Sequence, residues 1–221
     1  MSRDEVRLRP YGDTAVLVEL GSTDRVVAWS DALRALDSPL VAESVPAAET
    51  LLVLAAPGVA SVRVRDLLRD LVREWPPAAD DDLRDAGARP LDGQEEIEIV
   101  VRYDGPDLAD VARLTGLSAE EVVRAHTGTP WRVAFGGFAP GFGYLVGGDP
   151  RLEVPRRDEA RTRVPAGAVG LAGTFSGVYP RESPGGWQLI GTTDAVLWDL
   201  DREPPALLRA GATVRVVEAE R

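Results

Sequence analysis

The chain has 221 residues, enough for one large or two small domains, and its 44% hydrophobic content is that of a globular protein with its own core. Its 25 basic and 36 acidic residues give a formal net charge of -11, which argues against binding to nucleic-acid phosphates or to an anionic membrane. The sequence has no cysteine and no lysine, which excludes disulfides, thiolate nucleophiles, Walker-A phosphate loops and lysine Schiff bases.

The first 75 residues alternate the patterns of strands and helices. Residues 15–20, 41–45 and 51–54 are short apolar runs typical of strands, whereas residues 24–37 and 61–75 carry apolar side chains at helical spacing. The order β-β-α-β-β-α predicts a small antiparallel sheet with two helices on one face.

The composition changes at residues 76–94, which are rich in proline and aspartate and contain almost nothing to bury. We therefore expect an N-terminal α+β domain at residues 1–78, a linker at 79–94 and a second domain at 95–221. The adjacent aspartates at 80–82 fit a solvated tract better than a metal site, and we expect no metal centre.

The second domain begins with an alternating strand pattern and continues through two helices into glycine-rich β structure. One helix is predicted from Pro106 to Gly116, and the next begins with the capping box Ser118-x-x-Glu121. Short apolar runs between glycines predict a closed or sandwich-like β domain. These runs occupy residues 131–135, 169–172, 187–190 and 196–200.

The loop sequence GGFAPGFGYL at residues 136–145 combines flexible glycines with Phe138, Phe142 and Tyr144. It is either a loop that faces a ligand or a turn pinned by aromatic core residues. No helix pattern follows its glycines, so it is not a dinucleotide-binding fingerprint.

Two further segments carry polar side chains beside tight turns. Arg161 and Arg163 share one face if they lie on a strand, where they either clamp a carboxylate or phosphate or face solvent. Trp187 suits a core position, and Gln188 is either directed into a pocket or exposed on an edge strand.

The only histidine, His126, lies at the end of the capped helix. A single imidazole without cysteine is a poor metal site, and no serine lies in a nucleophile elbow. A structural role is favoured, because a cationic ring suits the negative end of a helix dipole.

The segments GFAPGFGYL, PRR (residues 155–157) with RTRVPAGAVGLAG, and VYPRESPGGWQLIG closely resemble the family of the 5-oxoprolinase B subunit, which includes the kinase inhibitor KipI and chains called allophanate hydrolase subunit 1. The likeness also covers residues 11–21, 101–126 and 207–217. It implies an α+β N-terminal domain followed by a cyclophilin-like β-barrel. It further implies a complex with the A and C subunits of 5-oxoprolinase, which uses ATP to hydrolyse 5-oxoproline to glutamate. A cytoplasmic location is expected from the residues themselves, because they show no secretory signal and no apolar run of membrane-spanning length.

Other functions remain open beside this one. The chain departs from the family pattern at Gly143, Ala168 and Thr192, so the substrate is 5-oxoproline, another lactam or a urea derivative. The resemblance also allows an inhibitor of a sensor histidine kinase, of KipI type, or a member of a urea- or allophanate-type complex. A prolyl isomerase is suggested by fold analogy alone. Without lysine, the chain is not itself a Ser-Ser-Lys amidase.

The expected substrate, a small ring with a carboxylate and an amide, suggests a site in the second domain. Arg163 is predicted to bind the carboxylate and Gln188 the amide, and both are predicted as catalytic residues. The predicted substrate-binding residues around them are Phe142, Tyr144, Gly167 and Trp187. We also expect the aromatic residues Phe138, Phe142, Tyr144 and Trp187 to expose an apolar patch that binds the partner protein, the C subunit.

Overall fold

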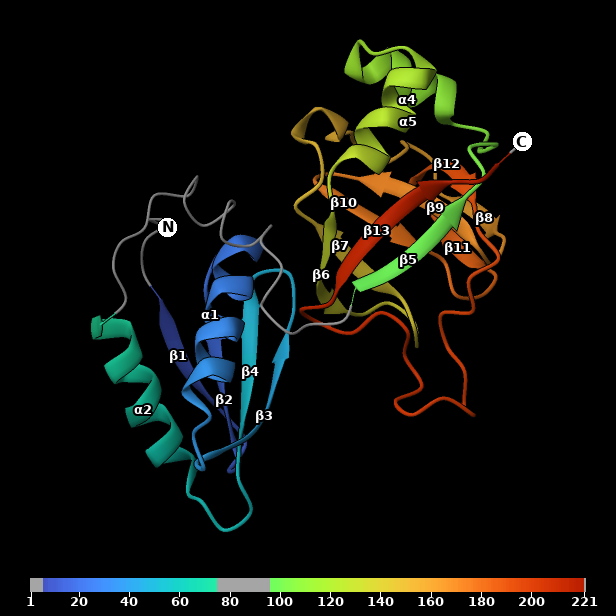
Figure 1. Cartoon of the computed structure of the whole chain (residues 1–221). Helices are drawn as coiled ribbons and strands as arrows, with labels where there is room; N and C mark the ends of the chain where they lie inside the picture. The colour runs from blue at the N-terminus through green and yellow to red at the C-terminus, as the bar shows by residue number, and fades with distance from the viewer. Residues whose placement is uncertain (1–5, 75–95, 221) are drawn as a thin grey trace. The chain divides into compact units, whose positions relative to one another are not determined.

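The computed structural model describes residues 6–74 and 96–220 and divides the chain into two units, Met1–Gly87 and Ala88–Arg221 (Figure 1). The predicted linker at 79–94, with its aspartates at 80–82, lies outside the described residues. No helix within the described ranges is long and apolar enough to cross a membrane.

The first unit has the predicted order β-β-α-β-β-α. Its antiparallel sheet has the strand order β1-β2-β4-β3. The elements are β1 (Arg7–Tyr11), β2 (Ala15–Glu19), α1 (Thr23–Leu36), β3 (Val41–Pro46), β4 (Thr50–Ala55) and α2 (Ser61–Glu74).

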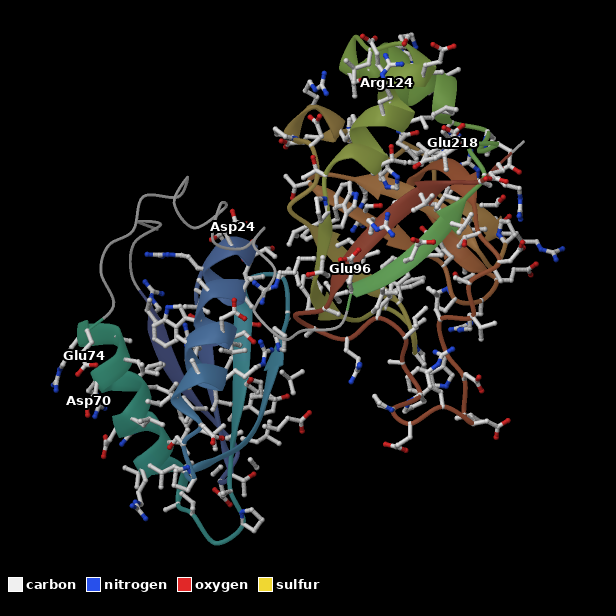
Figure 2. The ribbon with its side chains drawn as sticks, viewed as in Figure 1. Asp24, Asp70, Glu74, Glu96, Arg124 and Glu218 are labelled. Atoms are coloured by element: carbon white, nitrogen blue, oxygen red, sulfur yellow. The ribbon has the colours of Figure 1, made fainter. Side chains whose placement is uncertain are left out.

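Both helices of the first unit pack on the same face of its sheet. Val16 and Val18 alternate along β2 and lie in one buried cluster with Trp29 of α1 and Leu68 of α2. Val16 and Val18 are two residues apart on a strand and therefore point to the same face of the sheet. Because side chains of both helices join them in one cluster, both helices cover that face. Figure 2 shows the exposed side chain of Asp70 on the outer side of α2.

The described part of the second unit contains two α-helices and most of the described strands. Its first elements are β5 (Glu96–Val101), α4 (Leu108–Thr115) and α5 (Ala119–Gly128). The predicted capping box of α5 is confirmed, because Ser118 and Glu121 each accept a hydrogen bond from the other's backbone N–H, at 3.2 and 2.8 Å. The remaining elements are β6 (Trp131–Gly136), β7 (Gly143–Val146), the 3-10 helix η1 (Pro150–Leu152), β8 (Arg161–Val164), β9 (Ala168–Ala172), β10 (Phe175–Val178), β11 (Ser183–Gly185), β12 (Gln188–Thr192) and β13 (Thr213–Glu218).

Seven of these strands form a nearly closed barrel. Their order is β12-β9-β10-β7-β6-β13-β5, and the two edge strands meet where Arg102 and Thr192 exchange backbone hydrogen bonds of 2.8 Å. Gly191 permits this approach, because a Cβ there would lie 2.4 Å from the carbonyl oxygen of Arg102. Of the two β architectures predicted, the structure therefore has the closed one.

The run at residues 196–200 does not form the predicted strand. Among the described residues, its bridge joins Trp198 to Ala206 within the same loop. Leu197 is buried and anchors the loop, while Val196 and Leu200 are 58% and 83% exposed. The short apolar run is present, but the loop pairs with itself and adds no strand to the described barrel.

Candidate functional site

Seven aromatic side chains converge beside β7, β10 and β12, and we call them the aromatic cluster. Phe142 lies at its centre, with its ring centroid 5.0 Å from Tyr144 and 5.4 Å from Trp187. Most pairs are edge-to-face, the arrangement that ring quadrupoles favour. The members are Phe135, Phe138, Phe142, Tyr144, Phe175, Tyr179 and Trp187.

The loop that precedes β7 holds Phe138 in an unusual conformation. Phe138 has φ 62, although it is not glycine, and its side chain is 57% exposed. Its ring still contacts Phe142 and Tyr179, with centroid distances of 5.3 and 6.0 Å. A left-handed backbone at a bulky residue costs of the order of 1 kcal/mol and is often found at binding sites. The loop therefore presents one fixed aromatic ring to solvent.

A buried carboxylate connects this region to the start of α4. Oδ1 of Asp107 accepts hydrogen bonds from Arg157 and Arg161 at 2.9 and 2.7 Å. Its Oδ2 accepts from the backbone N–H of Leu189 at 2.7 Å. Asp107 is only 2% exposed, so this charge is stabilised by its two guanidinium partners. A two-arginine clamp thus exists, but it binds the protein's own carboxylate.

The predicted pair Arg161 and Arg163 does not act on one group. Arg163 is exposed, and its Nε and Nη2 donate to Glu182 at 3.1 and 2.7 Å. Arg161 turns instead to Asp107. Sequence spacing placed both on β8, but the carboxylate that each binds lies on a different element.

The other predicted residues lie in or next to the aromatic cluster. Gln188 is 6% exposed, and its Nε2 donates to the carbonyl oxygen of Pro155 at 3.2 Å, so it is an internal polar group and not an exposed edge residue. Gly167 has φ 78, and a Cβ there would lie 2.3 Å from the carbonyl oxygen of Thr193. Its place next to Thr193 thus admits only glycine.

The expectation of an exposed aromatic patch is wrong in part. Phe142 and Trp187 are 3% and 5% exposed, and Tyr144 is half-buried. They are covered because they pack on one another, which buries more apolar surface than a row of separate side chains would. Of the four residues expected to be exposed, only Phe138 is.

His126 is a second buried polar centre in this unit. Its Nδ1 lies 2.7 Å from the hydroxyl of Tyr103, and its Nε2 lies 2.9 Å from that of Ser176. Burial lowers the pKa of His126 to about 3 and raises the pKa of Tyr103, next to which Glu218 adds negative charge (Figure 2). The ring is therefore neutral, and the expected cationic interaction with the helix dipole is wrong.

Three of the arginines near the aromatic cluster are already paired and do not form a triphosphate site. Phosphate binding needs several converging donors, whereas Arg157, Arg161 and Arg163 are all paired with carboxylates. Within residues 6–74 and 96–220, no group of three or more histidine and acidic side chains can hold a metal ion.

Sequence reasoning missed Asp107 and Arg157. An aspartate just before a helix indicates an N-cap, and an arginine in the doublet at 156–157 indicates a solvated charge. Their partners lie 50 or more residues away in the sequence, so no local pattern identifies them.

The chain matches the family described as "Carboxyltransferase domain, subdomain C and D" over residues 6–208. It is 36% identical to TTHA0988, whose crystal structure superposes with a TM-score of 0.67 over 97% of this chain and 40% of that longer one. The urea carboxylase of Kluyveromyces lactis shares the fold at 16% identity and a TM-score of 0.61, over 97% of this chain and 22% of that one.

A relative of similar length is also found. The protein named as the B subunit of 5-oxoprolinase in Escherichia coli O157:H7 is 40% identical over 224 residues, which cover 96% of each chain. Proteins of Bacillus subtilis and Haemophilus influenzae with the same name also match. The chain belongs to the family of the 5-oxoprolinase B subunit, within the carboxyltransferase C and D subdomain family.

Proposed function

We propose that the chain is the B subunit of a cytoplasmic, ATP-dependent 5-oxoprolinase, with a cyclophilin-like barrel as its second unit. The observation that supports this most is the end-to-end match to a protein of that name, at 40% identity over 96% of both chains. In this proposal the chain is inactive alone and acts with the A and C subunits. The kinase-inhibitor and urea-type alternatives have less support, because the curated relatives share the 5-oxoprolinase name.

The reaction opens a five-membered lactam. Water adds to the ring carbonyl, the amide C–N bond breaks, and the product is glutamate; ATP hydrolysis supplies the driving force. In our proposal this chain binds and orients the substrate. Asp107 and Arg161, which are ion-paired, serve as part of the scaffold around the site.

We assign substrate contacts to the predicted residues. Phe142, Tyr144 and Trp187 would form the apolar wall, and Gly167 would keep the backbone close. Gln188 would meet the lactam amide, and Arg163 would release Glu182 to bind the carboxylate. The exposed Arg163–Glu182 pair is compatible with such an exchange, since surface ion pairs contribute only about 0–1 kcal/mol.

The test is to reconstitute the three proteins and to follow the consumption of ATP and 5-oxoproline with this chain present and absent. Arg163→Ala and Gln188→Ala are expected to lower turnover by about 100-fold, the scale of one lost transition-state donor, with the complex intact. Arg113→Ala is the control, because Arg113 is an exposed, ion-paired arginine on α4. Turnover without this chain would contradict its role as a required subunit. Activity of both variants within about threefold of the unmodified protein would contradict the assigned substrate contacts.

A further inference from the structure

One arginine of the segment at residues 155–163 has no carboxylate partner among the described residues. Arg157 and Arg161 pair with Asp107, and Arg163 pairs with Glu182. Arg156 is exposed and makes no ion pair or side-chain hydrogen bond within the described parts of the chain. Its guanidinium is therefore available to an external anion.

The backbone on both sides of Arg156 is held in place. The carbonyl oxygen of Pro155 accepts the side-chain hydrogen bond of Gln188 at 3.2 Å. The backbone N–H of Arg157 donates to the carbonyl oxygen of Gly186 at 2.8 Å. These two bonds hold residues 155–157 against residues 186–188, which include Trp187. An arginine on a fixed backbone loses less entropy on binding than one on a free loop.

The aromatic cluster supplies the surroundings of this guanidinium. The hydroxyl of Tyr179 lies against the backbone of Gly185, where a Cβ would come within 2.3 Å of it, directly before the Gly186 carbonyl that accepts from Arg157. The charges of Arg156 and Arg161 favour the ionised form of this hydroxyl. Burial outweighs them and raises the pKa of Tyr179. The ring of Tyr179 contacts three other aromatic rings, and one of them is the exposed ring of Phe138, at 6.0 Å between centroids. Arg156, which has no carboxylate partner among the described residues, and the exposed ring of Phe138 thus both lie near Tyr179.

We propose that Arg156 and Phe138 form a binding site for a small cyclic molecule that carries one carboxylate. The guanidinium fork matches a carboxylate in two parallel hydrogen bonds, and the ring of the ligand covers Phe138. A single guanidinium without a partner in the described ranges suits one negative charge better than a triphosphate. The inference rests on the proposed function in one respect: 5-oxoproline is a ring of this kind. Arg156 would then be the primary carboxylate contact, and Arg163 a secondary one.

The experiment measures binding to the assembled complex by calorimetry, with 5-oxoproline and with 2-pyrrolidinone, the same ring without its carboxylate. Arg156→Ala is expected to weaken 5-oxoproline binding by about 10-fold or more and to leave 2-pyrrolidinone binding unchanged. Phe138→Ala is expected to weaken both, because it removes the surface under the ring. Arg156→Lys is expected to lie between, since it keeps the charge without the fork. Arg113→Ala is the charge-matched control, and urea unfolding of each variant confirms an intact fold.

Three outcomes overturn the inference. Arg156→Ala with unchanged affinity and unchanged KM for 5-oxoproline, in a complex that turns this substrate over, shows that the site is wrong while the proposed function stands. An Arg156→Ala effect on ATP affinity alone shows that the anion is a phosphate. If the unmodified complex does not consume 5-oxoproline, the proposed function fails by itself. The site is then tested with 2-furoate, a flat cyclic carboxylate. Loss of 2-furoate binding in Arg156→Ala supports the site. Equal 2-furoate binding by the unmodified complex and Arg156→Ala, or no binding by the unmodified complex, overturns it.

Discussion

At the scale of single residues, two polar side chains in the interior of the second unit are held by partners from distant segments. His126 is fully enclosed between the hydroxyls of Tyr103 and Ser176, and Asp107 is enclosed between two guanidinium groups. Unpaired, each of these groups would cost several kcal/mol in the interior. They therefore specify which segments of the barrel unit meet: α5 with β10, and the start of α4 with residues 157–161.

His126 is expected to stay neutral throughout the range in which histidine normally titrates. Its folded pKa, about 3, lies below the ordinary 6.5, so the unfolded chain binds more protons between these values and stability falls as pH decreases from 6.5. NMR of the ring protons should show no titration between about pH 5 and 8. Because the chain has one histidine, the signal is unambiguous. A midpoint near 6.5 in the folded protein would contradict the burial of the ring.

At the scale of elements, the contact between the ends of β5 and β12 determines whether the seven strands form a barrel or an open sheet. Without the backbone pair between Arg102 and Thr192 the seven strands would form an open sheet with two free edges. Arg102 also forms a two-bond ion pair with Asp194, at 2.8 and 3.0 Å, just beyond the end of β12. This ion pair is exposed, so the geometry of the backbone at this seam matters more than the charges.

Gly191→Ala is expected to lower the free energy of unfolding by about 1–3 kcal/mol, because the new methyl group collides with the carbonyl oxygen of Arg102. Amide exchange at Arg102 and Thr192 should accelerate with it. Gly128→Ala is the matched control, since nothing lies within 4 Å of a Cβ there and alanine favours the helix. Urea unfolding and hydrogen exchange make the comparison. Equal stability of both variants would show that the seam tolerates a side chain.

At the scale of the whole molecule, three exposed apolar residues of the barrel unit gather on one loop. We call Val196, Trp198 and Leu200 the apolar strip; they are 58%, 40% and 83% exposed. The loop is held by its own hydrogen bonds, including that from Asp199 N–H to the carbonyl oxygen of Pro205 at 3.0 Å. Apolar side chains displayed on a fixed loop are typical of protein interfaces.

The apolar strip is expected to contact the C subunit in the proposed complex. The curated relatives are named as a B subunit, which implies a complex of several subunits. Trp198→Ala combined with Leu200→Ser should weaken association by about 10-fold or more, measured by sedimentation at micromolar concentration. Leu114→Ser, at another exposed leucine of this unit, is the control. Separate monomers of the unmodified proteins would contradict the complex, and an unchanged double variant would contradict the role of the strip.

The sequence alone determined the elements whose signals are local. The N-terminal order of strands and helices and the capping box at Ser118 depend on residues a few positions apart, because periodicity and capping act within one or two turns. The closed β architecture was one of two that the short glycine-bounded runs allowed. The residues that carry the family resemblance also lie in contiguous segments, which is why the family could be inferred before the fold.

Only the tertiary structure decided which side chains meet. Asp107 forms ion pairs with Arg157 and Arg161, and Arg163 forms one with Glu182. Arg156 forms no ion pair in the described parts of the chain. The sequence showed these arginines as equivalent charges near one turn. Their difference arises because strand register and closure of the barrel set the distance from each guanidinium to a carboxylate many residues away, and ion pairing falls off within a few ångströms. The run at 196–200 shows the same limit, since a strand needs a neighbouring strand as well as a short run of apolar residues.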